Sequence, residues 1–591
     1  VDVGFDIYRQ IDGAEPEKIN SKSLIKTTDF VDTTAPQGKV VSYRVRAISE
    51  ENEGALSAPA TIHVGVDSNA YTRVKLQGNY AFQKVGVADL DGDGRYDYVI
   101  KQPGGNVDPY INYWKRSPET FKLEAYTADG DFLWRHDLGW AIERGIWYSP
   151  YVVYDFDGDG KAEVAVKTGE GDPRDKDGRV QSGAEYLTIL DGLTGEPITR
   201  IEWPSRSLFD NTTNPYNYAS RNQLGVAFLD GKTPCLIVER GTYNVIVVIA
   251  YELSGGKLRE LWQWDNLKLP RHYSGQGAHF MHAADVDGDG RDEVTIGSVA
   301  IDDNGESLWS TGLGHPDHHY VGDLDPSRPG LEIYYGIESP QRERNGMCLV
   351  DAATGEIIWG HEGSTRHVHS RGMCSDIDAR YEGAECYSAD TDEQKKADRA
   401  FLRTASGQEI SNELRWSFGP LTVYWDADPQ REIIWRRRIS DYEGMTHEPQ
   451  IEGGVIVVAD IQGDWREEII TSVDGEIRLY TTTIPAVDRR PCLMTDPIYR
   501  IDVAHGSMGY TQVPMLTYDL ASRAAKIVPV APSDFNGDGR VDFVDYLNFT
   551  KHFGQDSSDE GFDAQFDLNK NGDVGFSDFV LFAQHFGQSV G

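Results

Sequence analysis

The sequence has few cysteines, no excess of positive charge and no long apolar run, and each absence excludes a class of protein. Its 591 residues include 95 acidic and 57 basic side chains, a formal net charge of −38. This charge excludes a bulk electrostatic attraction to nucleic acid or to an anionic membrane. No apolar run is long enough for a membrane-spanning helix. The cysteines are odd in number and form no C-x-x-C pair, so they indicate neither a disulfide framework nor a zinc site. They are Cys235, Cys348, Cys374, Cys386 and Cys492.

Several familiar local signatures are also missing. There is no G-x-S-x-G elbow, phosphate-binding P-loop, H-E-x-x-H or dinucleotide fingerprint. A hydrolase with paired carboxylates stays open, but the acids are too numerous to single out a pair. No signal peptide is present, and Val1 leads almost at once into the strand-like FDIYRQ. We therefore expect the chain to begin inside a domain, with a leader and early strands preceding it.

An acidic turn repeats along the middle of the chain. VGVADLDGDGRYDYVI (85–100), YVVYDFDGDGKAEVAV (151–166) and MHAADVDGDGRDEVTI (281–296) are near copies. Each has Asp at positions 1, 3 and 5, Gly at 6 and an acid at 9, and strand-like flanks. Alternating carboxylates on a tight turn converge on one ion, and oxygen is the ligand that Ca²⁺ takes. We predict calcium turns between strands, with the ligands Asp89, Asp91, Asp93, Asp97, Asp155, Asp157, Asp159, Glu163, Asp285, Asp287, Asp289 and Glu293.

Weaker copies of the turn follow, and a degenerate one lies around Asp230. A second unit, a Gly turn before a strand ending in Trp, recurs between the copies, as in DAATGEIIWG. Together the two units describe one antiparallel blade, so seven or eight blades of a propeller are predicted. The rival, stacked β-sandwiches, does not explain a repeated acidic turn. Predicted calcium ligands in the weaker copies are Asp323, Asp325, Glu332, Asp376, Asp378, Glu385, Asp460, Asp464 and Glu468.

The two ends of the chain differ from the repeats. Residues 1–68 contain short alternating strands, and YRVRAISENEGALSAPATIHV resembles the last two strands of a fibronectin type III module. After a linker at 528–533, two calcium loops, each followed by an amphipathic helix, repeat within 534–591. Their predicted ligands are Asp534, Asn536, Asp538, Asp542, Asp545, Asp567, Asn569, Asn571, Asp573 and Asp578.

The duplicated C-terminal loops resemble a type I dockerin, since each has only one helix and Asp at its twelfth position. The resemblance implies docking onto the cohesin of a scaffold protein. The loop positions that carry specificity in dockerins are Phe543, Val544, Phe576 and Ser577 here, a mainly apolar set. A calcium-stabilised tag or a dimerising unit is the alternative.

Histidines recur just before the acidic turns. Eleven of the fifteen lie between residues 272 and 505, and His279, His315 and His367 each precede a turn at the start of a strand. Trp147 and Tyr148 hold the same register in an earlier repeat. These residues occupy the same position relative to the acidic turn in several blades. We therefore predict that they share one face of the propeller, at a mouth of the central channel. Histidine, arginine and tyrosine favour a lyase, because elimination from a uronate needs its carboxylate neutralised, a base and an acid.

In these same stretches the chain resembles rhamnogalacturonan lyases of polysaccharide lyase family 11. The resemblance covers about residues 5–518, and implies an eight-bladed calcium propeller that binds acidic polysaccharide. The matching stretches are DGKAEVAVKT, SGAEYLTILDGLTG, HAADVDGDGRDEV, STGLGHPD, GDLDPSRPGLE, DAATGEIIWG, SRGMCSDID, GDWREEI, LYTTTIP and DPIYR. The resemblance implies that His279, His315, Arg371 and Tyr510 bind substrate.

The chain departs from the family pattern in three places. It has Glu443-Gly444-Met445-Thr446 where the family has Asn-Gly-Thr-Lys, Gln83-Lys84 for an Asn-Asp pair, and Pro103 for an Asp. Because the family lysine is absent, we expect His447 or Tyr510 to carry the proton, with Arg371 and Ca²⁺ on the carboxylate.

The expected fold is mainly β. It comprises a fibronectin III-like domain at 1–68, an eight-bladed β-propeller at 69–527, a linker at 528–533 and a dockerin-like calcium domain at 534–591. The expected protein is secreted, and it cleaves the rhamnogalacturonan I backbone of pectin by β-elimination. A lyase for another uronate polymer, or a non-catalytic carbohydrate-binding propeller, is the alternative.

Overall fold

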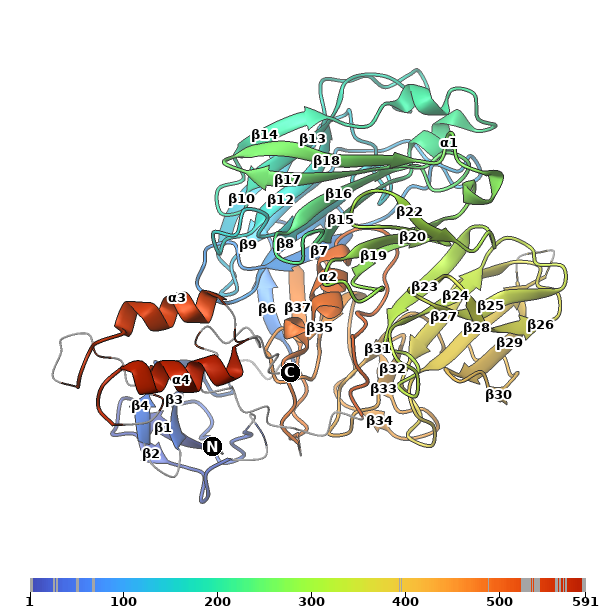
Figure 1. Cartoon of the computed structure of the whole chain (residues 1–591). Helices are drawn as coiled ribbons and strands as arrows, with labels where there is room; N and C mark the ends of the chain where they lie inside the picture. Colours follow the sequence, from blue (N-terminus) through green and yellow to red (C-terminus); the bar gives the residue numbers. More distant parts are fainter. Residues whose placement is uncertain are drawn as a thin grey trace.

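Short strands make up most of the molecule, and its helices are few and short (Figure 1). The computed structural model describes residues 4–521, apart from 25–26, 28–29, 49–52, 66–69, 393, 395 and 487. In the C-terminal region it describes residues 533, 535, 541, 543–557, 562, 565–566, 568 and 571–586. Among these residues, no helix combines the length and the apolar character needed to cross a membrane. The prediction of a mainly β fold with a small helical C-terminal region is confirmed.

Most strands belong to four-stranded antiparallel sheets that resemble the blades of a propeller (Figure 1). In seven such sheets of the described residues, four consecutive strands pair in chain order. The first four are β7 (Lys84–Ala88), β8 (Asp97–Gln102), β9 (Lys122–Tyr126) and β10 (Phe132–Asp137); β11 (Tyr151–Tyr154), β12 (Glu163–Gly169), β13 (Glu185–Asp191) and β14 (Pro197–Glu202); β15 (Asn222–Ala227), β16 (Cys235–Arg240), β17 (Val247–Ser254) and β18 (Lys257–Asp265); and β19 (Gly277–Ala284), β20 (Glu293–Gly297), β21 (Val299–Ile301) and β22 (Ser307–Ser310).

The next three sheets follow the same order. They are β23 (Pro316–Gly322), β24 (Glu332–Ile337), β25 (Arg344–Asp351) and β26 (Ile357–Glu362); β27 (Val368–Ser375), β28 (Glu385–Thr391), β29 (Ala397–Thr404) and β30 (Glu409–Ser411); and β31 (Thr422–Val423), β32 (Glu432–Trp435), β33 (Arg438–Ser440) and β34 (Thr446–His447). Each predicted acidic turn lies between the first and second strands of its sheet.

One further sheet joins the two ends of the repeat region. Its strands are β35 (Gly454–Ala459), β36 (Glu468–Val473), β37 (Glu476–Tyr480) and, from far earlier in the chain, β6 (Thr72–Lys75). In the register of β6 and β37, Val74 lies opposite Ile477. The first strand of this sheet, β35, also contacts β7, the first strand of the sheet that follows β6. The last sheet therefore lies beside the first.

In these sheets the first strand is more buried than the fourth. All eight residues of β19 are buried, for example, whereas the fourth strand β18 is largely half-buried or exposed. The α2 helix (Pro497–His505) packs against β7, β11, β15, β19 and β35, so it lies among these inner strands (Figure 1). Its start is encoded locally, because Asp496 caps it by accepting a hydrogen bond from the Tyr499 amide at 3.0 Å, and Pro497 follows directly.

The remaining elements lie at the ends of the chain and in loops. A five-stranded sheet contains β1 (Gly4–Ile11), β2 (Glu17–Lys18), β3 (Val40–Ile48), β4 (Glu53–Leu56) and β5 (Ala60–His63). The short helices are η1 (Arg206–Phe209), α1 (Pro215–Ala219), η2 (Arg271–Tyr273) and η3 (Leu493–Thr495). Near the C-terminus, α3 (Phe543–His552) and α4 (Phe576–His585) enclose Phe549, Phe566 and Val574.

Part of the predicted C-terminal calcium loops falls outside the described residues. These residues are Asp534, Asn536, Asp538, Asp542, Asp567 and Asn569. Among the described ligands, Asp545 and Asp578 are fully buried in the first turns of α3 and α4. Asp545 accepts a hydrogen bond from the Phe535 amide at 2.8 Å, and Asp578 accepts one from the Gly575 amide at 2.8 Å. Each carboxylate thus ties a loop to the helix that follows it.

Candidate active site

The acidic turns bring carboxylates together as the sequence predicts. Asp89 accepts hydrogen bonds from the Gly92 and Gly94 amides at 2.7 and 2.8 Å, and both glycines have positive φ. Ligand oxygens of Asp89, Asp91 and Asp97 lie within 4.8 Å of one another, as do those of Asp155, Asp157 and Glu163.

These turns fit a bound cation. Burial, with Asp157 nearby, raises the pKa of Glu163 to about 8. The Oε1 atoms of Glu293 and Glu385 are buried with no hydrogen-bond partner among the described residues. A buried carboxylate oxygen is costly unless it is paired, and a hard cation such as Ca²⁺ pairs it.

A further acidic turn was missed in the sequence. Asp426, Asp428 and Glu432 lie between β31 and β32, in the position that the predicted turns occupy in other sheets. Ligand atoms of Asp426, Glu432, Asp441 and His447 lie within 4.8 Å of one another. The spacing D-x-D-x-x-x-E in WDADPQREI was the available signal, but this turn lacks the glycine that marks the others.

His447 therefore lies among carboxylates. Its Nε2 atom contacts Asp441 Oδ1 and lies 3.8 Å from Asp426 Oδ2, and its side chain is buried. Among the described residues its ion-pair contacts are to Asp441 and Asp426, and none is to His279 or His315. The structure thus separates His447 from His279, His315 and Tyr510.

The channel histidines form a second, different cluster. Ligand atoms of His279, His315, Asp317 and Glu338 lie within 4.8 Å of one another, and Glu338 also groups with His367 and His369. His315 Nε2 lies 3.2 Å from His279 Nε2 and 3.1 Å from Glu338 Oε2. Glu338 Oε1 lies 3.3 Å from His367 Nε2, and Asp317 Oδ1 lies 3.2 Å from His369 Nδ1. These six side chains are called the histidine cluster below.

The Nδ1 contact of His315 fits metal binding. Its Nδ1 contacts the Gly277 carbonyl oxygen, which only accepts hydrogen bonds, so Nδ1 carries the proton. Nε2 faces the His279 imidazole and the Glu338 carboxylate, so it donates a hydrogen bond to Glu338 and becomes a metal ligand only on losing that proton. Metal-binding histidines commonly donate their other N–H to a backbone carbonyl in this way.

Aromatic side chains surround the histidine cluster. The Trp147 and Tyr510 rings lie 4.8 Å from the His279 ring, and the Tyr243 ring lies 4.9 Å from the His315 ring. A cavity of about 250 Å³ adjoins them, lined among others by Asp317, His318, Tyr510 and Gln512. Most of these side chains come from the starts of β11, β19 and β23 and from the segment after α2, and Tyr243 lies between β16 and β17. The cluster therefore lies at one end of these sheets.

Burial sets the protonation of this site. It lowers the pKa of His279 well below the usual value, with further repulsion from His315 and Arg221, so His279 is neutral. Burial raises the pKa of Tyr510 well above the usual value, so its phenol keeps its proton. For Glu338, burial acts to raise the pKa, but the hydrogen bond and charge of His315 outweigh it and lower the pKa.

The sequence-predicted residues thus divide into three groups. His279, His315 and Tyr510 meet at one end of the sheets. His447 lies in a separate cluster. Arg371 belongs to β27, the strand that carries His369, but its side chain lies outside the described residues.

The sequence prediction missed Asp317 and Glu338. Asp317 is two residues from His315, and Glu338 follows directly after β24, the partner strand. The neighbouring histidines were the available signal for Asp317, and the sequence around Glu338 held none.

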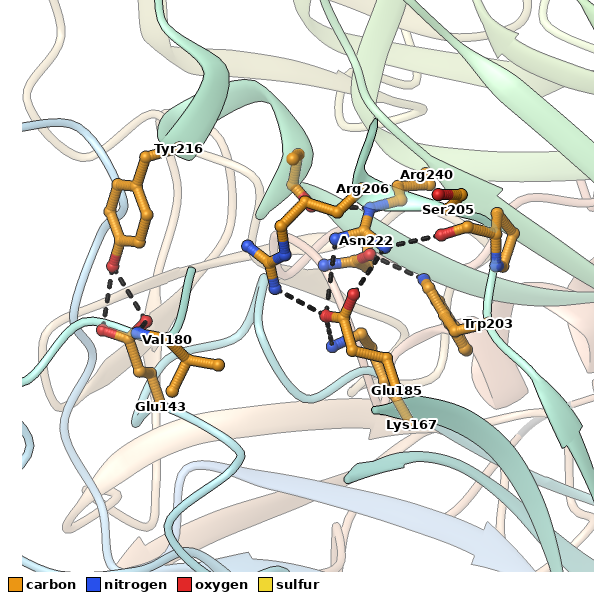
Figure 2. A network of polar contacts seen from close by, with 12 residues as sticks. Glu143, Lys167, Val180, Glu185, Trp203, Ser205, Arg206, Tyr216, Asn222 and Arg240 are labelled. Atoms are coloured by element: carbon orange, nitrogen blue, oxygen red, sulfur yellow. Dashed lines mark hydrogen bonds and ion pairs between the residues drawn. The ribbon is translucent and has the colours of Figure 1, made fainter. Parts of the chain in front are cut away.

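Two glutamates, the buried Glu143 and the half-buried Glu185, hold the loops at the same end of the sheets (Figure 2). Glu185 accepts hydrogen bonds from Lys167, Arg206 and Arg240 at 2.8, 2.6 and 2.8 Å. Burial opposes its charge, but the three cations outweigh burial and lower the pKa of Glu185. Since Lys167 is in β12 and Arg240 in β16, this network ties two neighbouring sheets together.

Comparison with known proteins identifies relatives along most of the chain. Residues 60–528 match the model of the rhamnogalacturonan lyase family 11 C-terminal domain, and residues 532–586 match the dockerin type I domain. The rhamnogalacturonan endolyase YesW of Bacillus subtilis is 36% identical over 565 residues, covering 88% of this chain and 87% of its own. The exolyase YesX of the same organism is 34% identical over 583 residues, covering 88% and 91%.

Solved structures agree with the sequence comparison. The crystal structure of YesW superposes with a TM-score of 0.79 at 35% identity, covering 88% of this chain and 92% of that one. A Bacillus licheniformis rhamnogalacturonan lyase superposes with a TM-score of 0.76 at 35% identity, with the same coverage. The chain therefore shares its fold with these relatives over most of its length.

Proposed function

The chain belongs to rhamnogalacturonan lyase family 11, with a dockerin type I domain at its C-terminus, and we propose that it cleaves the rhamnogalacturonan I backbone by β-elimination at galacturonate. The main support for this proposal is the histidine cluster, which lies within residues 60–528, the region that matches the rhamnogalacturonan lyase family. Elimination removes the C5 proton of galacturonate, forms the C4–C5 double bond and breaks the bond from C4 to the leaving oxygen, which takes up a proton.

The histidine cluster supports the first requirement, a neutralised uronate carboxylate. Its imidazoles and two carboxylates are the ligand set of a divalent cation, and a bound cation would supply the positive charge that holds the carboxylate. His315, on losing its Nε2 proton, and Glu338 would hold this cation. Arg371, in the same strand as His369, is proposed to bind the carboxylate bidentately.

The pair of Tyr510 and His279 supports the second requirement, a proton acceptor and a proton donor. A neutral His279 can accept the C5 proton, and a protonated Tyr510 can donate to the leaving oxygen. His447 was the alternative proton carrier. Its position among Asp426, Asp441 and Glu432 favours a role in a cation site instead.

The oxygen-rich turns are proposed to bind Ca²⁺ and to hold strand ends together. Their buried carboxylates carry negative charge that a cation would compensate, and such ions need not touch substrate. The eight four-stranded sheets of the described residues, with β35 beside β7, support closure into one eight-bladed propeller over about 69–527. The β1–β5 sheet is proposed to be a fibronectin III-like module.

The test of the reaction is a panel of polyuronides. The product of elimination is a 4,5-unsaturated uronate, which absorbs in the ultraviolet because its double bond is conjugated with the carboxylate. We expect absorbance to rise with rhamnogalacturonan I and not with homogalacturonan or alginate. A rise with another polymer alone would assign a different substrate, and no rise with any polymer would indicate a carbohydrate-binding module.

The dockerin domain is proposed to attach the enzyme to a cohesin of an extracellular scaffold. Phe576, at a specificity position, is 71% exposed at the start of α4. An exposed aromatic there favours a cohesin with an apolar face.

Removal of residues 529–591 should abolish binding to a cohesin-bearing scaffold and leave turnover of soluble substrate unchanged. Loss of turnover would instead show that this domain supports the active site.

A further inference from the structure

Four loops lie at the same end of the sheets as the histidine cluster. Residues 103–121 follow β8, residues 139–147 precede β11, residues 170–184 join β12 to β13, and residues 203–221 precede β15. In each sheet, the start of the first strand and the last residues of the second strand lie on the same side. This is the side on which His279 and His315 lie. Figure 1 shows α1, within the last of these loops, beside the sheets of β11–β18.

One buried carboxylate, Glu143, joins all four loops, and Figure 2 shows two of its partners, Val180 and Tyr216. Glu143 belongs to the second loop and is 2% exposed. It accepts hydrogen bonds from Trp114 Nε1, Val180 N and Tyr216 Oη, each at 2.8 Å, and these donors come one from each of the other loops. Four loops held by one buried acceptor form a rigid surface rather than independent flaps.

This surface presents flat side chains to solvent. Tyr113 is 59% exposed and Tyr110 37% exposed, with ring centroids 5.8 Å apart. The Arg179 guanidinium stacks 4.2 Å from the Trp114 ring, and the Arg174 guanidinium stacks 3.6 Å from the Trp140 ring. These six side chains are called the aromatic platform. Aromatic rings pack against the apolar faces of sugar rings. Arg174 donates two hydrogen bonds of 2.6 Å to Asp172, whereas the Asp177 carboxylate lies 3.9 Å from Arg179, so Arg179 keeps donors for a substrate carboxylate.

The charge of these loops differs from that of the rest of the molecule. The four loops contain eight basic and eight acidic residues, so the formal charge of −38 resides entirely in the remaining sequence. A polyuronate is repelled by most of the protein surface and is not repelled here. The loops are therefore the electrostatically favourable path for an acidic polysaccharide toward the channel.

Asp108 connects the platform to the histidine cluster. It accepts a hydrogen bond from the Tyr110 amide at 2.7 Å and forms two with Arg221 at 2.8 and 2.9 Å. It also accepts one at 3.2 Å from Trp147 Nε1, whose ring contacts His279. Hydrogen bonds to the Asp108 carboxylate thus link the segment of the exposed tyrosines to Trp147, whose ring contacts His279.

We propose that the aromatic platform is a binding subsite for sugar units of the rhamnogalacturonan chain that lie outside the cleaved linkage. Tyr110 and Tyr113 pack against sugar rings, and Arg179 binds a galacturonate carboxylate. The inference rests on the proposed function, since it extends the same substrate along the same face. It predicts that the platform raises affinity for long chains and contributes nothing to the chemical step.

The test compares polymeric and short substrates. Tyr110→Ala/Tyr113→Ala should raise KM for polymeric rhamnogalacturonan I roughly three- to tenfold for each lost stacking contact. KM and kcat for the shortest cleaved oligosaccharide should stay unchanged. Phe132→Ala is the control, because Phe132 is also 37% exposed but lies at the start of β10, the opposite end of the same sheet.

Retention in a gel that contains rhamnogalacturonan I measures binding without turnover. The double variant should migrate faster than the wild type, and gels with a neutral galactan should not separate them. Equal retention and equal KM for polymer would overturn the subsite. Equal losses on polymer and oligosaccharide would also overturn it, by placing both tyrosines at the cleaved linkage. If the wild type cleaves no uronide, the proposed function fails, while the gel still tests the platform.

Discussion

Tyr510 is the residue whose position and protonation state agree best with a role in proton transfer. Its ring contacts His279, it adjoins the channel cavity, and burial keeps its phenol protonated. We expect Tyr510→Phe to lower kcat by about 10²–10⁴-fold, because a positioned acid contributes that much, with little change in melting temperature. Steady-state kinetics on rhamnogalacturonan I measures the effect.

His447→Ala is the matched comparison for that prediction. Since His447 contacts Asp441 and lies near Asp426, we expect a kcat within a few-fold of the wild type and a lower melting temperature at saturating calcium. A kcat loss as large as that of Tyr510→Phe, with unchanged stability, would restore His447 as the proton carrier and contradict the present assignment.

Glu143 shows how one buried acceptor can organise several loops. In Glu143→Gln, one of the two acceptor oxygens becomes a donor, so at least one of the three partners loses its hydrogen bond. Each bond lost to a charged acceptor costs about 1.5–3 kcal/mol of unfolding free energy. We expect a lower melting temperature and a raised KM for polymeric substrate, measured by calorimetry and kinetics.

The Glu143→Gln variant tests whether Glu143 affects binding of the polysaccharide by keeping the four loops rigid. Glu143 is buried and does not itself reach a bound chain. A variant that loses stability but keeps its KM for polymer would show that the four loops do not depend on this acceptor for their binding geometry.

At the scale of single elements, the β6–β37 pairing joins the ends of the repeat region. Val74 is buried at the edge of the last sheet, opposite Ile477. Val74→Pro removes a backbone donor and a buried side chain, and an unsatisfied buried carbonyl costs about 1–3 kcal/mol. We expect a fall in melting temperature for this variant, and little change for Thr72→Ala at the end of the same strand. Equal melting temperatures for the two variants would contradict the role of β6 in holding the sheets together.

The acidic turns were predictable because their chemistry is local. Asp, Gly and spacing specify the turn at Asp89, and the strands on each side follow from alternating apolar residues. The turn at Asp426 was missed because proline stands near its tip and glycine is absent, although its neighbours in space supply ligands. Only the folded chain brings Asp441 and His447 beside it.

The channel site was predictable in part, and for a different reason. One register in several repeats predicted that His279 and His315 share a face, and the structure places them 3.2 Å apart. Glu338 could not be assigned from sequence, because it lies after the second strand of its sheet, where the sequence shows no repeated motif. Its role follows only from the contacts that pairing of β23 with β24 creates.

For the whole molecule, bound cations are expected to account for much of the stability. Clustered carboxylates repel one another, and a ligand that binds only the folded state stabilises it, by about 2.7 kcal/mol per site at a hundredfold excess over Kd. We expect chelation to lower the melting temperature by many degrees and added calcium to restore it. An unchanged melting temperature after chelation would contradict the assignment of the turns as calcium sites.

The central claim, that the chain cleaves its substrate by elimination at the channel mouth, is tested most directly by carrying out the cleavage in water labelled with heavy oxygen. Elimination adds no water across the broken bond, so mass spectrometry should find unsaturated products without the label. Products that carry the heavy oxygen at the new reducing end, with no unsaturation, would show hydrolysis and contradict the account.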